Sequence, residues 1–176
     1  MTRRESALEA IRYHHPKTER QLMVQCGFSL RPVGGGAYRD AYQIIGTDLI
    51  IKLPRCEGQS IERIEYSIEH SWLEVDAIRK VMKSKAKRWQ MFKPLMPEIL
   101  YFNHTYGTIV MPKYKRVGHK RHSDTIRKLE YLVNRYHGVE DSDLHNAGNW
   151  AEDKDGNLKL IDMGCFLEGN TTCPSN

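Results

Sequence analysis

The sequence lacks the features that place a protein in a membrane or in an oxidising compartment. No run approaches the roughly 18 apolar residues that a membrane-spanning helix needs, and the opening MTRRESALEA is charged where a signal peptide has an apolar core. The 4 cysteines form no CxxC pair, so we expect reduced thiols and no cysteine metal site. We therefore expect a cytoplasmic protein without membrane contact.

The charge balance favours anionic partners without naming one. The 176 residues carry a formal net charge of +5, and an excess of this size is usually a solubility feature. The basic segment KSKAKRWQMFK, with Trp89 among its lysines, leaves nucleic-acid binding as the least favoured of three interpretations. The length suits one compact domain or two small lobes around a shared cleft.

The residue pattern predicts a mixed α+β protein. Two short helices are expected over 5–15 and 17–27, followed by a strand, a glycine turn and a hairpin over 28–55. Apolar residues three, four and seven positions apart predict an amphipathic helix over 61–83. A basic connector, KSKAKRWQMFKP, is expected over 83–94.

Further elements are expected in the second half of the chain. The segment EILYFNHTYGTIVMPKY predicts two strands about a turn near Gly107 that leave the sheet at Pro112. A third helix is expected over 123–138, and NWAEDKDGNLKLIDMG predicts a hairpin with a Lys-Asp-Gly turn. No internal repeat or flexible linker interrupts the chain.

A lone lysine stands in the apolar strand segment LIIKLP. Such a lysine, Lys52, must either reach water from an edge strand or find an anionic partner, because a buried unpaired charge is costly. Both arrangements remain open at this point.

Five short motifs follow one another along the chain. They are the glycine cluster VGGGAYRDAY, the strand LIIKLP, the segment TIVMPKYK, the loop DSDLHNAGNW and the terminal GNLKLIDMG. In this order they resemble the protein-kinase-like fold family, in a minimal form similar to phage-encoded serine/threonine kinase-like proteins. The resemblance covers residues from about 28 to about 164.

The resemblance implies an α+β, protein-kinase-like fold. A small antiparallel sheet lobe with one main helix would be joined to a truncated helical lobe, with an ATP cleft between them. The expected divisions are a helical lead-in over 1–27, an N-lobe over 28–112 and a reduced C-lobe over 113–176. The chain ends where larger kinases place their activation segment, so we expect a stripped form whose exposed apolar surface a homodimer or a host protein could cover.

The glycine cluster would form the loop over the phosphates of ATP. Its members are Gly34, Gly35 and Gly36, whose missing side chains let backbone N–H groups approach an anion. Arg39 stands where the family has a third glycine, and two readings remain open: it reaches a phosphate, or it is solvated.

Lys52 would hold the α- and β-phosphates and pair with a glutamate of the following helix. Glu74 is the favoured partner because it borders the apolar face of that helix, with Glu69 and Glu65 as alternatives. In TIVMPKYK, Val110 and Met111 would line the adenine pocket, and Tyr114 would lie in the hinge between the lobes.

The catalytic loop and the Asp-Met-Gly motif would supply the remaining groups. The resemblance implies Asp143 as the catalytic base, with Lys52 and Asn149 completing the catalytic set. Asn149 and Asp162 would hold Mg²⁺. The family has about five steps from the aspartate to the asparagine, whereas this loop has one more, so either the loop bulges or Asn146 substitutes.

The expected function is an ATP- and Mg²⁺-dependent phosphotransferase acting on Ser or Thr of a protein. If the chain is phage-encoded, that protein belongs to the host and the site of action is the host cytoplasm. The alternative is a pseudokinase, a nucleotide-binding module that inhibits or redirects a host protein.

Overall fold

The structure, a computed structural model, describes residues 1–56, 58–90, 92–117, 123–124, 127 and 146–162. Contacts divide the chain into two compact units. Unit 1 consists of Met1–Val75 and Glu98–Lys113, and unit 2 of Asp76–Pro97 and Tyr114–Asn176. The residues before the first strand therefore belong to the same unit as the main sheet.

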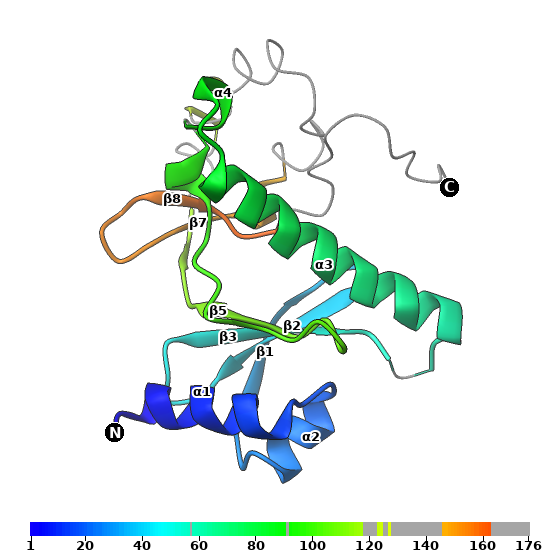
Figure 1. Cartoon of the computed structure of the whole chain (residues 1–176). Helices are drawn as coiled ribbons and strands as arrows, with labels where there is room; N and C mark the ends of the chain where they lie inside the picture. Colours follow the sequence, from blue (N-terminus) through cyan, green and yellow to red (C-terminus); the bar gives the residue numbers. More distant parts are fainter. Residues whose placement is uncertain (57, 91, 118–122, 125–126, 128–145, 163–176) are drawn as a thin grey trace. The chain divides into compact units, whose positions relative to one another are not determined.

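Unit 1 is built on a five-stranded antiparallel sheet with the order β1-β2-β3-β5-β4 (Figure 1). Its strands are β1 Leu30–Gly35, β2 Arg39–Ile44, β3 Leu49–Pro54, β4 Tyr101–Phe102 and β5 Ile109–Pro112. Both expected hairpin regions are confirmed, as is the mixed α+β class. β3 lies in the middle of the sheet, with β2 and β5 as its neighbours.

Helices cover both faces of this sheet (Figure 1). On one side, α1 Arg3–His14 and α2 Glu19–Val24 bury Ile11 and Leu22 against Ile51 of β3 and Val110 of β5. We call this side the core face. Because side chains alternate along a strand, Lys52 and its cross-strand partner Ala41 point to the opposite side, which we call the charged face.

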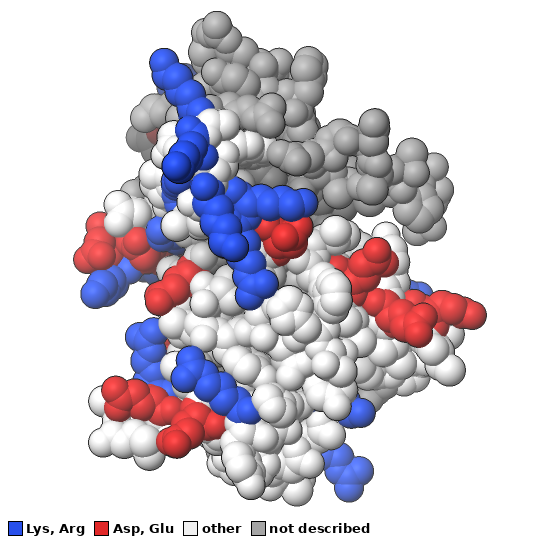
Figure 2. All heavy atoms as spheres, viewed as in Figure 1, with Lys and Arg blue, Asp and Glu red and all other residues white. Residues whose placement is uncertain are grey.

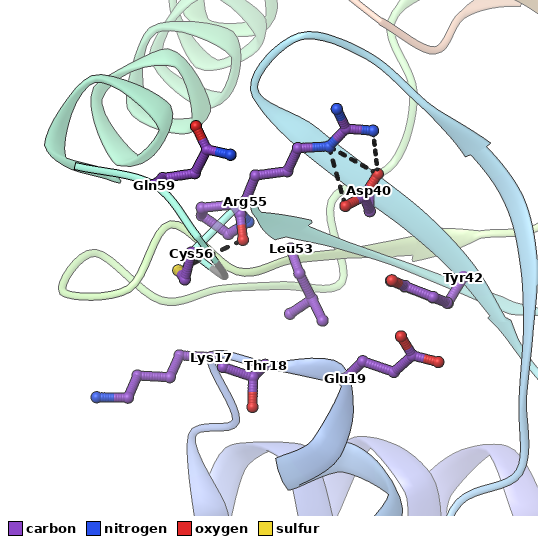
Figure 3. Close-up of a pocket in the computed structure, with 10 residues that line it drawn as sticks. Lys17, Thr18, Glu19, Asp40, Tyr42, Leu53, Arg55, Cys56 and Gln59 are labelled. Atoms are coloured by element: carbon purple, nitrogen blue, oxygen red, sulfur yellow. Dashed lines mark hydrogen bonds and ion pairs between the residues drawn. The ribbon is translucent and has the colours of Figure 1, made fainter. Parts of the chain in front are cut away.

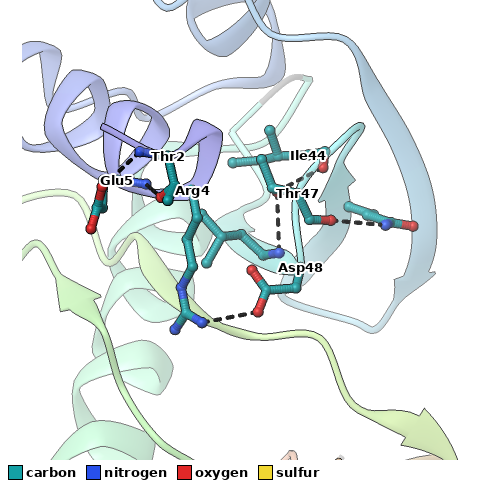
Figure 4. A network of polar contacts seen from close by, with 8 residues as sticks. Thr2, Arg4, Glu5, Ile44, Thr47 and Asp48 are labelled. Atoms are coloured by element: carbon teal, nitrogen blue, oxygen red, sulfur yellow. Dashed lines mark hydrogen bonds and ion pairs between the residues drawn. The ribbon is translucent and has the colours of Figure 1, made fainter.

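The first turn of α1 is held by a capping box and by an ion pair to the main sheet. Thr2 accepts a bond from the Glu5 backbone N–H, and the Glu5 carboxylate accepts one from the Thr2 N–H, which completes a capping box. Arg4 forms an ion pair with Asp48 in the β2–β3 turn, with 2.9 Å between Nη1 and Oδ2 (Figure 4). The N-terminal helix is thereby tied to the sheet by charge as well as by apolar packing.

The long helix α3 spans Ile61–Lys83, as the apolar periodicity predicts. Its part in unit 1 lies on the charged-face side of the sheet (Figure 1). Gly107, in the β4–β5 turn, has φ +65°, and a Cβ there would lie 3.1 Å from the Ile68 Cα. Only glycine suits this position, because the turn needs a left-handed backbone and passes close to the helix.

Unit 2 contains a second antiparallel sheet, with the order β6-β7-β8. Its described elements are the C-terminal part of α3, α4 Lys87–Gln90, η1 Lys93–Leu95, β6 Lys115–Arg116, η2 Ala147–Asn149, β7 Trp150–Glu152 and β8 Leu158–Leu160. The hairpin of β7 and β8 is confirmed. The expected basic connector is partly wrong, because it contains α4 and η1, and β6 was not expected, because two basic residues show no strand alternation. Most of the helix expected over 123–138 lies outside the described residues.

The described part of the chain shows the state of two cysteines and the length of the apolar helices. Cys26 and Cys56 are both free thiols. Burial raises the pKa of Cys26 above its ordinary value. Among the residues with described structure, no helix is both long and apolar enough to cross a membrane.

Candidate functional site

A buried carboxylate forms the centre of the candidate site in unit 1. Glu74 Oε1 accepts a bond from Lys52 Nζ at 3.0 Å, and Glu74 Oε2 is in close contact with Arg39 Nη1. The side chains are exposed to 0% for Glu74, 9% for Lys52 and 10% for Arg39. One carboxylate therefore binds two cationic groups away from bulk water.

The sequence produces this cluster through two periodicities. Strand alternation places Arg39 of β2 and Lys52 of β3 on the charged face. On α3, Tyr66, His70 and Glu74 are four residues apart and therefore lie along one side of the helix. The two periodic rows meet where the sheet packs against the helix.

The glycine turn is attached to the same side of α3. The ring of Tyr38 stacks on His70, with 4.3 Å between centroids and 14° between planes, and meets the edge of Tyr66. Arg39, the next residue, contacts Glu74. The end of the glycine turn and the cation that follows it are thus held by successive turns of one helix.

These contacts decide three alternatives left open by the sequence. Lys52 is not an edge-strand lysine that points to water, because β3 is the central strand of its sheet. Glu65 and Glu69 are exposed, whereas Glu74 is buried against Lys52. Arg39 is not a solvated side chain, since it is nearly buried and bound to Glu74. Its contact with Glu74 could not be inferred from its place in the glycine motif.

Glu74 gathers one guanidinium and one ammonium group on a single carboxylate. Charged groups away from water need partners of opposite sign, because desolvation of an ion is costly. Lys and Arg donors are the usual partners of phosphate oxygens in proteins. The donor set therefore fits a polyphosphate, in which oxyanions bind the two cations that share Glu74.

The three glycines play different structural parts. A Cβ on Gly35 would lie 2.6 Å from Asp40 Oδ1, so a side chain at this position would displace the Asp40 carboxylate. Gly34 and Gly36 have open space where a Cβ would lie. The Gly36 N–H donates to the Arg39 carbonyl at 2.8 Å, so this N–H serves the turn itself. Gly34 and Gly36 therefore have open space beside them, but the Gly36 N–H is already used within the turn.

The two β5 residues expected at the adenine pocket lie on opposite faces of the sheet. Met111 is buried and pairs with Ile50, so its side chain belongs to the charged face with Lys52. Val110 packs in the core-face cluster with α1 and α2, and the expectation that it lines the same pocket is wrong, because neighbouring strand residues alternate. Tyr114 is half-buried and belongs to unit 2.

In unit 2, the β7–β8 hairpin brings together two residues with oxygen-bearing side chains. Asn149 is buried, and its backbone carbonyl accepts a bond from the Ile161 N–H at 2.7 Å. Asp162 follows directly and is half-buried. Amide and carboxylate oxygens are the ligands that Mg²⁺ prefers, so this end of the hairpin has the chemistry of a magnesium site.

The remaining asparagine of the loop has a different role. Asn146 is exposed, and its Oδ1 caps η2 by accepting a bond from the Gly148 N–H at 2.9 Å. Asp143, the expected base, lies outside the described residues. Within the described ranges, no group of three or more His, Cys, Asp or Glu side chains could hold a metal ion. Asn149 and Asp162 are only two residues, and one of them is an asparagine, so they do not form such a group.

The turn of this hairpin is organised by Asp153. Its Oδ1 accepts bonds from the backbone N–H groups of Asp155 and Asn157, and its Oδ2 from the Asn157 side chain. Desolvation raises the pKa of Asp153, but these hydrogen bonds and the charge of Lys159 outweigh it and leave the pKa below its ordinary value. The ionised carboxylate thus fixes the turn.

In unit 1, a pocket of about 300 Å³ opens on the core face of the main sheet, the side opposite the Glu74 cluster (Figure 3). Asp40 lines it and holds Arg55 through a two-point ion pair with a shortest distance of 2.7 Å. That bond raises the pKa of Arg55. None of the residues expected to bind a nucleotide lines this pocket, so it is separate from the Glu74 cluster.

Lys and Arg side chains gather over α4 and the end of α3 (Figure 2). From Ala77 to Pro97 the chain contains several lysines and arginines but no aspartate or glutamate. The aromatic residue of this segment, Trp89, is half-buried, and its ring lies 5.8 Å from that of the buried Phe92. This packing does not favour Trp89 as an open stacking platform for nucleic-acid bases.

No protein-family model matches the chain. A search of curated proteins finds no match either. The observations that support a function are therefore the buried Glu74 cluster, the β7–β8 hairpin and the order of the sequence motifs.

Proposed function

We propose that the chain is an ATP- and Mg²⁺-dependent phosphotransferase with a protein-kinase-like fold that acts on Ser or Thr hydroxyls of a protein. The observation that carries this proposal is the buried carboxylate of Glu74 bound to both Lys52 and Arg39. The guanidinium of Arg39 and the ammonium of Lys52, gathered on one carboxylate, are donors of the kind that phosphate oxygens accept hydrogen bonds from.

Each residue has a separate role in the proposed reaction. Lys52 and Arg39 would bind phosphate oxygens, and Glu74 would hold both cations in place. Met111 would contact the adenine from the charged face, and Tyr114 would lie in the hinge. Asn149 and Asp162 would hold Mg²⁺.

Bound Mg-ATP would supply a phosphoryl group, whose bond to ADP breaks as a bond to the acceptor hydroxyl oxygen forms. Asp143 would orient that hydroxyl and accept its proton. The positive charge of Lys52 and Arg39 would stabilise the negative charge on the phosphate oxygens during transfer. Catalysis would therefore come mainly from positioning and electrostatics.

The direct test is incubation of the purified protein with radiolabelled ATP and Mg²⁺, alone and with a bacterial cell lysate. We expect label on serine or threonine of the protein itself or of a lysate protein, and no label from the Lys52→Met variant. Absence of label in every wild-type reaction would contradict the phosphotransferase proposal. Omission of Mg²⁺ serves as the matched control.

The alternative is a pseudokinase that holds a nucleotide and binds a host protein without phosphoryl transfer. The specific observation in its favour is the longer spacing from Asp143 to Asn149, together with the use of Asn146 as a helix cap. Asn146 would have to leave its cap to replace Asn149 as a ligand. Nucleotide binding without turnover, combined with capture of a host protein by the Asp143→Asn variant, would favour this alternative.

A further inference from the structure

A second group of cations lies on the charged face, around the amide of Gln43. This side chain is 9% exposed. Its Oε1 accepts bonds from Arg31 Nη2 and from Lys113 Nζ, the latter at 3.2 Å. Its Nε2 donates to the Thr47 carbonyl at 3.3 Å, which fixes the amide with its oxygen toward the two cations.

Two like charges thus share one neutral oxygen. Both side chains are exposed to water, which weakens the Coulomb repulsion between the guanidinium and the ammonium, and an anion between them would remove it. Among the described residues, neither Arg31 nor Lys113 forms an ion pair with a carboxylate. The Asp48 carbonyl accepts a bond from the Lys113 N–H at 2.6 Å, but the Asp48 carboxylate is bound by Arg4 instead (Figure 4).

We propose that Arg31, Gln43 and Lys113 form a second oxyanion-binding site, which takes a phosphate or carboxylate group. The guanidinium offers parallel N–H donors and the ammonium offers a compact charge, and together they suit one tetrahedral or planar oxyanion. Bound there, the anion accepts the hydrogen bonds that Gln43 now accepts and neutralises the repulsion between the cations.

The site is separate from the Glu74 cluster. Gln43 and Arg39 lie on the same face of β2, four residues apart, which corresponds to roughly 13 Å along a strand. The charged face therefore has two cationic centres, and a ligand with anionic groups at both ends would reach both. The second centre requires neither ATP nor phosphoryl transfer.

The probe for the test is inorganic phosphate, added to the full chain with sodium chloride at equal ionic strength as the reference. Thermal unfolding of the wild type should shift upward with phosphate relative to chloride, because a ligand that binds only the folded state stabilises it. The Arg31→Gln, Lys113→Gln double variant should bind phosphate at least tenfold more weakly. The matched control, Arg20→Gln with Arg63→Gln, removes two exposed charges of the same unit and should respond like the wild type.

A third variant keeps the test decisive if the double variant folds poorly. Gln43→Glu places a carboxylate between the two cations without a change in size. It should raise the melting temperature in chloride and abolish the response to phosphate. A wild type that responds equally to phosphate and chloride, or a Gln43→Glu variant with an undiminished phosphate response, would overturn the proposal.

Two further arms identify the source of the oxyanion and separate this site from the proposed enzyme activity. A phosphoserine peptide and adenosine 3′,5′-bisphosphate should each compete with phosphate, and the tighter competitor indicates whether the group comes from a peptide or from a small molecule. Failure of both to compete would contradict the site. The Asp162→Asn variant should lose its response to Mg-ATP but keep its response to phosphate, so the two proposals can fail separately.

Discussion

At the scale of single residues, Glu74 is the buried carboxylate on which two cationic side chains depend. Its carboxylate is fully buried and binds both Lys52 and Arg39. Such a cluster contributes little net stability compared with apolar packing, because desolvation offsets the attraction. Loss of one member is a different matter, since the remaining charges stay buried without their partner.

The first prediction concerns the Glu74→Gln variant. We expect it to lose about 3–5 kcal/mol of unfolding free energy, the usual cost of breaking a buried ion pair. Urea unfolding followed by circular dichroism measures this loss. The control is Asp76→Asn, which removes an exposed carboxylate two residues away that pairs with Lys80 in the same helix. It should change stability by about 0.5 kcal/mol or less, and equal losses in the two variants would refute the role given to Glu74.

At the scale of elements, the N-terminal helices form one side of the core of unit 1. Leu22 of α2 and Ile11 of α1 are fully buried against strands β2, β3 and β5. Thr108, before β5, also donates its hydroxyl hydrogen to the Pro16 carbonyl at 2.8 Å. These helices therefore shield the apolar residues of the core face.

The second prediction compares two apolar residues of α2 that differ in burial. Leu22 is 0% exposed and Val24 is 74% exposed. Leu22→Ala should reduce the unfolding free energy by about 2–5 kcal/mol, because it removes buried methyl groups and leaves a cavity. Val24→Ala should have an effect within about 0.5 kcal/mol. Chemical denaturation of both variants, side by side, provides the measurement, and similar midpoints would argue against a structural role for α2.

The third prediction concerns the turn between β7 and β8. The folded-state pKa of Asp153 lies below its ordinary value of 3.8, so its ionised form stabilises the hairpin above that pH. This stabilisation is lost as the pH falls through the folded-state pKa. Asp153→Asn should therefore lower the melting temperature at pH 7, and the difference from the wild type should shrink as the pH falls from about 5 to about 2. A difference independent of pH would show that the carboxylate charge does not hold the turn.

Several elements could be predicted from the sequence because their signals are periodic. The apolar spacing of α3 gave its bounds, and the Lys-Asp-Gly turn located the β7–β8 hairpin. The β6 strand could not be predicted, because its two residues are exposed and its pairing with β7 depends on distant chain segments. The prediction that Val110 lines the adenine pocket was wrong, because a motif match does not specify which face of the strand each residue occupies.

The candidate site was predictable to the extent that it follows strand and helix periods. Glu74 borders the apolar side of α3, and this position marks it for burial beside Lys52. The Arg39 contact and the Gln43 cluster were missed, because the first joins a strand to a helix and the second joins residues of separate strands and loops that are distant in the sequence. Strand alternation could have predicted part of this arrangement. It places Arg39, Ala41 and Gln43 on the same face of β2, and Ala41 is the cross-strand partner of Lys52, so all four side chains lie on the charged face.

At the scale of the whole molecule, the residues expected to bind Mg-ATP are divided between the two units. Lys52 and Glu74 belong to unit 1, whereas Asn149 and Asp162 belong to unit 2. Among these groups, the expected cation Lys52 lies in unit 1 and the expected metal ligands lie in unit 2. A protein with only one of the two units would lack part of the proposed set of residues.

The fourth prediction separates nucleotide binding from turnover. Mg-ATP at 100 times its dissociation constant should stabilise the wild type by about 2.7 kcal/mol. Asp162→Asn should abolish both this Mg²⁺-dependent stabilisation and phosphoryl transfer. Asp143→Asn should keep the stabilisation while turnover falls by about 10²–10⁴, the usual contribution of a positioned acid or base. Thermal shift and labelled-ATP assays measure the two quantities, and parallel losses in both variants would contradict the separate roles.

The order of strands in the main sheet also affects how the chain folds as it is synthesised. β1, β2 and β3 are consecutive and can pair as soon as they emerge from the ribosome, but the other neighbour of β3 is β5, which begins at Ile109. On the order of fifty residues must be translated between these strands, which takes several seconds at the usual rate. During that time the apolar edge of β3 has no partner and is open to association with other chains. Aggregation of nascent chains, with its dependence on translation speed and chaperones, is therefore expected to arise at LIIKLP.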